Sequence, residues 1–503
     1  MVRWIGLSIG MVALAVAPAT AQRGTQIIIS QPADATTMDP GRSTQVLTVN
    51  YFFNLYDTLT RWDAALKLQP ALATSWKAVN ETTWEVTLRP GVKFHDGSPL
   101  TSEDVKAVYE RNMVPGKTVV QSGFSTFEAV QAVNPTTLRI VTKKPDPLVP
   151  VRMAQMGGTI YPARFATDEG ARELARKPVG SGAYKFVSWT KDDQLVMEAN
   201  PGWWGWNGKP PAIDRVIWKP IPDDFARLSA LQRGEVDVIT NVPPDQMRIV
   251  RTLTVPATRT VTFWINTTQA PTSDRRVRQA MHYAMDVHSI VKDLYAGQGK
   301  PFSGGLADTD FGYNASLKPY AYDPAKAKKL LTEAGFANGI DLTLYAGSGT
   351  MVNDKQLLEA LADMWSKVGI RARIEMMEMA ARQKMNNERT VPANGLMLIN
   401  PQSTLLDADG SVWRLFHPNG FGGRYWIGSQ PGQRFHDLME QARYTLDPKK
   451  RRELYTEATR IIHEDKPWLE LFQEVVIYGV AKRVIFKPRP DYRLIVAEMT
   501  SGK

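Results

Sequence analysis

The sequence contains no cysteine. A chain without a thiol cannot form a disulfide, use a cysteine nucleophile, bind an iron–sulfur cluster or carry a lipid on an N-terminal cysteine. Histidine is scarce as well, and no two histidines have the i,i+3 or i,i+4 spacing that places a pair of metal ligands on one helix face. The six are His95, His282, His288, His417, His436 and His463. We therefore predict neither a bound metal nor another cofactor.

Common catalytic motifs are missing too. The chain has no G-x-S-x-G nucleophile elbow, no phosphate-binding P-loop and no H-E-x-x-H zinc pair. Residues 188–191 match S-x-x-K, but they fall in a predicted strand and turn and lack the companion motifs of the enzymes that use it. The sequence thus argues against an enzyme, and a secreted hydrolase is kept only as an alternative.

The composition is that of a globular protein, with 503 residues, 43% hydrophobic and 22% charged. This length corresponds to about three domains. The net charge is +10, but the one dense basic run, residues 449–452, opens an amphipathic helix and is typical of a solvated helix face. We expect no nucleic-acid partner.

The first 21 residues have the pattern of a secretory signal peptide. Arg3 provides the positive charge, residues 5–16 form an apolar run, and Ala19-Thr20-Ala21 matches a cleavage site. The run is too short for a membrane span, which needs about 20 apolar residues. We predict cleavage after Ala21, a mature chain that starts at Gln22, and export to the periplasm.

Two stretches more than 100 residues apart each have the pattern of a βαβ unit. The first is strand 213–219, helix 223–233 and strand 236–240, and the second is strand 340–345, helix 353–368 and strand 370–376. Parallel sheets of this type bind ligands outside the carboxyl ends of their strands. The sequence therefore predicts two α/β lobes with a ligand cleft between them, preceded by a mixed α+β region.

Residues 84–109, WEVTLRPGVKFHDGSPLTSEDVKAVY, are similar to the signature of the family 5 extracellular solute-binding proteins. These are the periplasmic components of peptide, opine and nickel ABC importers. Five further segments resemble the same family in the same order along the chain: PALATSW at 70–76, PVGSGAYKF at 178–186, VRQAMHYAMD at 277–286, YDPAKAKKLLTEAGF at 322–336 and DKPWLELF at 465–472. The resemblance extends over nearly the whole mature chain.

The resemblance implies an α/β fold of the two-lobed periplasmic binding protein type, class II-like and cluster C, with an extra N-terminal α+β subdomain. The expected boundaries are 1–21 for the signal peptide, 51–184 for the subdomain, 266–469 for lobe II, and 22–50, 185–265 and 470–503 for a discontinuous lobe I. The chain would be a monomeric, non-catalytic receptor. It would capture a small polar solute, which we expect to be a peptide or amino-acid derivative, and deliver it to ABC permease subunits in the inner membrane. A carrier of chelated metal or haem is the alternative on the same scaffold.

In peptide binders of this family, an aspartate after a tryptophan in a second-lobe loop holds the peptide ammonium, and an acidic-Pro pair follows three residues later. If Asp409-Gly410 replaces that pair, Leu406 stands at the ammonium position and the tryptophan is missing. We predict that Asp407 contacts the ligand and that Asp409 caps the helix at 411–416. The backbone of residues 347–350 is a candidate anion site. The full set of predicted ligand contacts is Gln402, Ser403, Thr404, Asp407, His417 and Arg382.

Overall fold

The computed structural model describes residues 25–348, 350–418, 425–426 and 428–502. The predicted signal peptide, Gln22 and Gly349 of the candidate anion loop lie outside this part of the chain. Within it, no helix has both the length and the apolar composition needed to cross a membrane.

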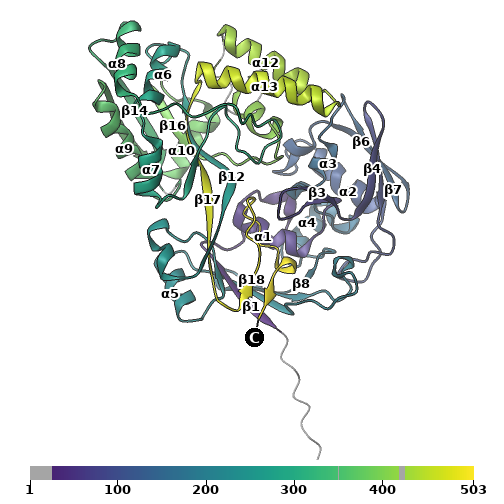
Figure 1. Ribbon diagram of the computed structural model, residues 1–503. Helices are drawn as coiled ribbons and strands as arrows, with labels where there is room; N and C mark the ends of the chain where they lie inside the picture. Colours follow the sequence, from purple (N-terminus) through teal and green to yellow (C-terminus); the bar gives the residue numbers. More distant parts are fainter. Residues whose placement is uncertain (1–24, 349, 419–424, 427, 503) are drawn as a thin grey trace, which may run out of the picture.

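Among the described residues, one mixed sheet of 11 strands runs through both lobes (Figure 1). The long antiparallel strands β12 (Thr252–Ile265) and β17 (Trp468–Val480) form its centre and carry the chain from one lobe to the other and back. The remaining strands are β11 (Val238–Ile239), β1 (Gln26–Gln31), β10 (Arg215–Pro220), β9 (Gln194–Ala199) and β8 (Tyr184–Thr190) on one side, and β16 (Gly395–Ile399), β14 (Ile340–Gly347) and β15 (Ile370–Met377) on the other, while β13 (Gly299–Pro301) pairs with β17.

The two lobes are therefore not built on separate sheets, although the sequence shows two separate βαβ patterns. The predicted boundaries at residues 265 and 470 fall at the end of β12 and within β17, the strands that connect the lobes. In lobe I, β10 and β11 both run parallel to β1 and flank it, and helix α5 (Asp224–Gln232) connects them.

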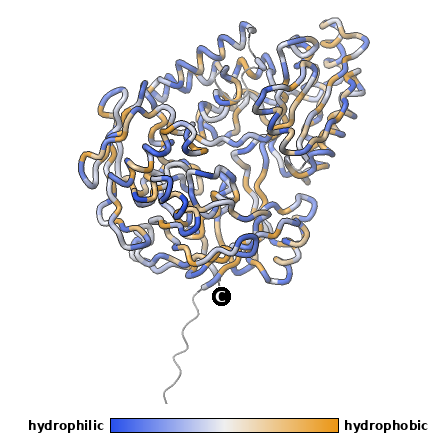
Figure 2. Tube along the Cα trace, turned by 180° about the vertical axis from the view of Figure 1, so that it is seen from behind, coloured by the Kyte–Doolittle hydropathy of each residue, from blue (hydrophilic) through white to orange (hydrophobic). Residues whose placement is uncertain are grey.

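Lobe II contains the second predicted unit, in which β14 and β15 are parallel neighbours connected by α9 (Asp354–Ser366). Trp365 on α9 is fully buried in the core of this lobe. The other helices are α6 (Arg275–Tyr283), α7 (Val287–Leu294), α8 (Pro324–Glu333), α10 (Met379–Glu388), α11 (Arg414–Phe416), α12 (Gln430–Arg443) and α13 (Pro448–Asp465). Figure 2 shows hydrophobic residues along the inner strands and hydrophilic residues on outer helices and loops.

The N-terminal region is an α+β unit, as predicted. An antiparallel sheet in the order β4 (Ala73–Asn80), β5 (Thr83–Leu88), β7 (Thr137–Thr142), β6 (Phe127–Asn134) packs against α2 (Ser102–Met113). Helix α2 starts with a capping box, in which Thr101 and Asp104 satisfy each other's backbone N–H groups. The region also contains α1 (Val46–Leu55), α3 (Val149–Arg152), α4 (Asp168–Leu174), β2 (Thr60–Trp62) and β3 (Leu68–Pro70), and two short strands follow near the C-terminus, β18 (Val484–Ile485) and β19 (Thr500–Ser501).

Candidate functional site

A cavity of about 460 Å³ lies between the N-terminal subdomain and lobe II. Phe53 and Arg152 line it from the N-terminal part of the chain, and residues 402–406 and 409–410 line it from a lobe II loop. The C-terminal segment 491–493 forms a further part of the wall. Segments that are hundreds of residues apart thus meet around a space large enough for a small molecule.

A second cavity of about 370 Å³ lies beside the connecting strands, with Asn241 on the lobe I side and Thr350 and Asn400 on the lobe II side. Tyr492 lines both cavities. Its hydroxyl donates a hydrogen bond to Glu474 at 2.6 Å, and the guanidinium of Arg259 lies 4.8 Å from its ring centroid. Tyr492 is therefore held in place where the cavities adjoin.

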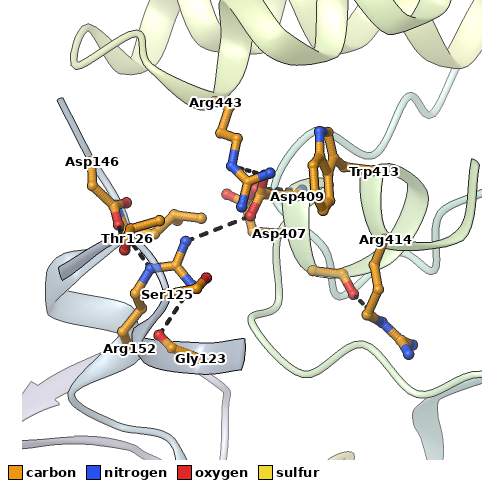
Figure 3. A network of polar contacts seen from close by, with 12 residues as sticks. Gly123, Ser125, Thr126, Asp146, Arg152, Asp407, Asp409, Trp413, Arg414 and Arg443 are labelled. Atoms are coloured by element: carbon orange, nitrogen blue, oxygen red, sulfur yellow. Dashed lines mark hydrogen bonds and ion pairs between the residues drawn. The ribbon is translucent and has the colours of Figure 1, made fainter. Parts of the chain in front are cut away.

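An ion-pair network crosses the larger cavity (Figure 3). Arg152, at the end of α3, pairs with Asp146 of its own subdomain at 2.8 Å and reaches Asp409 of lobe II at 3.7 Å. On the lobe II side, Arg443 lies 3.4 Å from Asp409, and its guanidinium stacks over the Trp413 ring. Of these contacts, the one between Arg152 and Asp409 joins the subdomain to lobe II across the cavity.

Asp409 is one of two buried aspartates that line the larger cavity, the other being Asp491. Only 3% of Asp409 is exposed, and in the described part of the chain its side chain accepts no hydrogen bond. Burial raises the pKa of Asp409, while Arg443 and Arg152 oppose that rise. A buried carboxylate with unused acceptor capacity at a cavity wall is suited to bind a cationic group.

Asp407 has a different environment from Asp409. It accepts hydrogen bonds from Arg451 at 2.6 Å, from the Tyr455 hydroxyl at 3.1 Å and from the backbone N–H of Asp409 at 2.9 Å. It is 2% exposed and lines neither cavity. The geometry therefore gives the cavity-facing position to Asp409, whereas Asp407 has all its partners within lobe II.

The predicted capping role of Asp409 is wrong. Residues Asp409–Trp413 form a π-helix that continues into α11, and Ala408, the residue before it, makes no side-chain capping hydrogen bond. The backbone N–H at the start of this helix donates to Asp407, not to Asp409. The carboxylate of Asp409 is thus free of the backbone and directed to the cavity, where Arg152 and Arg443 approach it.

Three other predicted contacts, Gln402, Ser403 and Thr404, line the larger cavity. The hydroxyls of Ser403 and Ser411 hydrogen-bond each other at 2.9 Å, which ties the loop to the π-helix. Leu406, at the position where the family places its aspartate, adopts a left-handed backbone conformation with φ of 52° and gives the wall an apolar surface. An ammonium group finds no partner on that side chain.

His417 and Arg382 line neither cavity. His417 stacks on Trp413 with an interplanar angle of 12° and lies 3.4 Å from Glu440. Arg382 is buried and donates a hydrogen bond to the carbonyl of Leu398 at 3.2 Å. The structure places both residues behind the cavity walls. Of the described residues in the candidate anion loop, Thr350 lines a cavity.

Within the described residues, no three His, Asp or Glu side chains are grouped so that they could hold a metal ion. The polar groups at the larger cavity are arginines, aspartates and neutral side chains, a set that recognises organic ions through hydrogen bonds and ion pairs.

Comparison with protein families matches residues 67–423 to the bacterial extracellular solute-binding proteins, family 5. The match covers well over half of the chain. The chain belongs to this family. Its members are periplasmic solute-binding proteins of ABC importers, and the two-lobed fold with a cavity between the lobes agrees with that function.

Relatives of this solute-binding protein cover almost its full length. It is 27% identical to the glutathione-binding protein GsiB of Escherichia coli K12, over 94% of this chain and 95% of the relative. Among solved structures, CtaP from Listeria monocytogenes has a TM-score of 0.86 at 22% identity, and the match covers 95% of this chain and all of the other. DppA from Helicobacter pylori, in complex with peptide STSA, has a TM-score of 0.78 at 24% identity, over 95% and 98% of the two chains. These structures share the fold.

The sequence did not single out the cavity arginines of this solute-binding protein. Arg152, Arg414, Arg443 and Arg493 stand in four different segments, and no local pattern distinguishes them from the other basic residues. Their meeting depends on how the subdomain, lobe II and the C-terminal segment pack, so only the tertiary structure assigns them to the site.

The solute-binding protein should lose stability with rising pH through Asp310, which lies behind the cavity loop. Burial raises the pKa of Asp310 to about 7, and the hydroxyls of Ser403 and Ser411 oppose that rise. The folded state then holds a proton that the unfolded chain releases near pH 4. This contribution to stability is present at low pH and is lost as the pH rises through about 7.

We expect the free energy of unfolding of the unmodified protein, measured relative to Asp310→Asn, to fall by about 2 kcal/mol between pH 5 and pH 8. The amide of the variant replaces the neutral acid and still accepts from Ser411, which donates to Asp310 at 3.0 Å. Asp57, whose pKa burial raises to about 6, contributes equally to both proteins. Urea unfolding at the two pH values measures the difference, and a constant difference would contradict a proton on Asp310.

Proposed function

We propose that this chain is a monomeric, non-catalytic receptor that captures a peptide or amino-acid derivative in the 460 Å³ cavity and delivers it to the permease of an ABC importer. We further propose that residues 1–21 are removed on export to the periplasm. The observation that carries the proposal is Asp409, a buried carboxylate at the cavity wall that accepts no hydrogen bond within the described residues.

Physical chemistry supports this ligand class. Moving an ammonium group from water into a closed cleft is costly unless a carboxylate pairs with it. Asp409 offers such a partner, and Gln402, Ser403 and Thr404 beside it offer polar groups for a peptide backbone. We propose these four residues as ligand contacts, and Asp407, His417 and Arg382 as supports behind the walls. GsiB, a relative, is a glutathione-binding protein, and the related DppA structure holds a peptide.

The direct test is to identify what the purified protein carries. Native mass spectrometry should show one chain with a bound peptide or amino-acid derivative that denaturation releases. Metal analysis and absorbance of the same sample distinguish a chelated-metal or haem carrier. A hydrolysis assay on the released compound tests for enzymatic activity. A preparation that binds metal chelates and no peptide would overturn the proposal.

A captured peptide should stabilise the protein by mass action. For the most tightly bound probe, with glutathione and the peptide STSA as the first to be tested, we expect about 2.7 kcal/mol of added unfolding free energy at a concentration 100 times the dissociation constant. Because the ligand contacts both sides of the cavity, the scattering radius should also decrease on binding. Stabilisation with an unchanged radius would contradict capture by lobe closure.

A further inference from the structure

The charged side chains that line the 460 Å³ cavity include more cations than anions. They are Arg152, Arg414, Arg443, Arg493, Asp409 and Asp491. Three of the four arginines have a carboxylate nearby: Arg152 has Asp146 at 2.8 Å, Arg443 has Asp409 at 3.4 Å, and Arg493 has Asp491 at 3.4 Å. In the described part of the chain, Arg414 forms no ion pair.

Ion pairs formed by residues outside the cavity lining leave this excess of positive charge in place. Asp491 also binds Arg489 at 2.8 Å, but Arg489 has a second partner in Glu498 at 3.2 Å, so that this group adds no net charge. Asp310 and Arg414 both border a small space of about 10 Å³ on the far side of the loop. The carboxyl of Asp310 accepts from Ser411 at 3.0 Å and forms no ion pair with Arg414. Among the described residues that line the cavity, Arg414 is therefore the cation without a counter-charge.

The position of the Arg414 side chain is fixed by neutral groups. Its Nε donates to the carbonyl of Gly410 at 3.1 Å, and Nη2 donates to the carbonyl of Gln402 at 3.3 Å. A guanidinium has five N–H donors, so both N–H groups of Nη1 and one of Nη2 remain for another acceptor. Figure 3 shows the side chain of Arg414 directed away from Asp409.

The energetics favour an anionic partner for Arg414. The side chain is partly buried, and burial lowers its pKa. A guanidinium withdrawn from water without a counter-ion is unfavourable, and a carboxylate matches its planar fork with two parallel hydrogen bonds. A neutral ligand would leave this cost in place when the cavity closes.

We propose that Arg414 binds a carboxylate of the ligand, and that the captured solute is an acidic peptide or amino-acid derivative with a net negative charge. This inference rests on the proposed capture of a peptide. A ligand ammonium bound to Asp409 would share this carboxylate with Arg152 and Arg443. A second carboxylate of the ligand, placed near these two arginines, would neutralise the added positive charge. The ligand therefore has one ammonium group and two carboxylates.

Calorimetric titration with charge-matched probes tests the proposal. The probes are glutathione and its two monoamides, the peptide Ala-Glu-Gly, and Ala-Gln-Gly, which has one carboxylate fewer. The proteins are the unmodified chain, Arg414→Gln, Arg414→Lys and the control Arg460→Gln, an exposed arginine of α13 that pairs with Glu464. We expect Arg414→Gln to weaken binding of the best acidic probe by about 30-fold or more, Arg414→Lys to weaken it less, and Arg460→Gln to have no effect.

Combining the amidated ligands with the Arg414→Gln variant in a thermodynamic cycle shows which ligand carboxylate Arg414 binds. Amidation of the carboxylate that meets Arg414 should weaken binding to the unmodified protein strongly, and to Arg414→Gln only slightly. Acidic and neutral probes that bind equally well would overturn this inference and leave peptide capture standing. The same holds for wild-type affinity in a folded Arg414→Gln protein. If no probe binds the unmodified chain, the proposed peptide capture fails and this inference fails with it.

Discussion

Asp409→Asn is expected to weaken the binding of an ammonium-bearing peptide by about 2 kcal/mol or more, which corresponds to about 30-fold in dissociation constant. Asp409 is 3% exposed, and its contacts with Arg152 and Arg443 are too long or too poorly aligned to be hydrogen bonds, so its carboxylate keeps acceptor capacity for a ligand ammonium. The amide keeps the shape but removes the charge. Arg152 and Arg443 then face the cavity without their shared counter-charge and repel the incoming ammonium.

The matched control for this prediction is Asp437→Asn, an exposed aspartate of α12 whose hydrogen-bond partner is Gln433. It removes the same charge from the same lobe but does not touch the cavity, so we expect its affinity to remain within about twofold of the unmodified chain, as for surface substitutions generally. Titration calorimetry compares the variants. An N-acetylated probe, which lacks the ammonium, should bind Asp409→Asn and the unmodified chain alike. Unchanged affinity of Asp409→Asn for the free peptide would place the ammonium elsewhere.

The local elements of this fold follow from patterns that span a few residues. The βαβ unit over residues 340–376 is predicted by a strand, a helix and a stop at Gly369, and the structure has β14, α9 and β15 there in parallel register. Each of these signals is contained in one segment, because apolar periodicity and chain reversal depend on near neighbours.

The joining of the two lobes into one sheet was not predicted. It depends on β12 and β17, whose paired residues are more than 200 positions apart in the sequence. Both strands are apolar and nearly continuous, which indicates burial but does not identify the partner strand. Pairing at this separation is decided by the packing of the whole chain.

The candidate site was predicted in part for the same reason. The loop at residues 402–409 was located, but which of its two aspartates faces the cavity depends on what stands behind the loop. Arg451 and Tyr455, on α13, bind Asp407 and turn it inward. Arg152 then approaches Asp409 from another domain. The sequence Asp-Ala-Asp alone does not show that Asp407 has partners on α13 or that Arg152 lies near Asp409.

Asp407→Asn is expected to lower the free energy of unfolding by about 3 kcal/mol or more. Asp407 and Arg451 have side chains that are 3% and 6% exposed, and they are 2.6 Å apart. Removing the negative charge leaves a buried guanidinium without a counter-ion, and the Tyr455 hydroxyl loses a charged acceptor. Urea unfolding measures the change, with Asp437→Asn again as the surface control.

The double variant Asp407→Asn/Arg451→Met separates loss of the pair from general damage to the loop. A methionine fills similar space without a charge, so the double variant should recover most of the stability that Asp407→Asn loses, since a buried ion pair can often be replaced by apolar groups at little cost. Peptide affinity in Asp407→Asn, measured below its unfolding transition, should stay near that of the unmodified chain because Asp407 lines neither cavity. A stable Asp407→Asn protein that no longer binds peptide would reverse the roles assigned to the two aspartates. In that case the carboxylate of Asp407 would have to leave Arg451 to meet the ligand, and the double variant would then fail to bind as well.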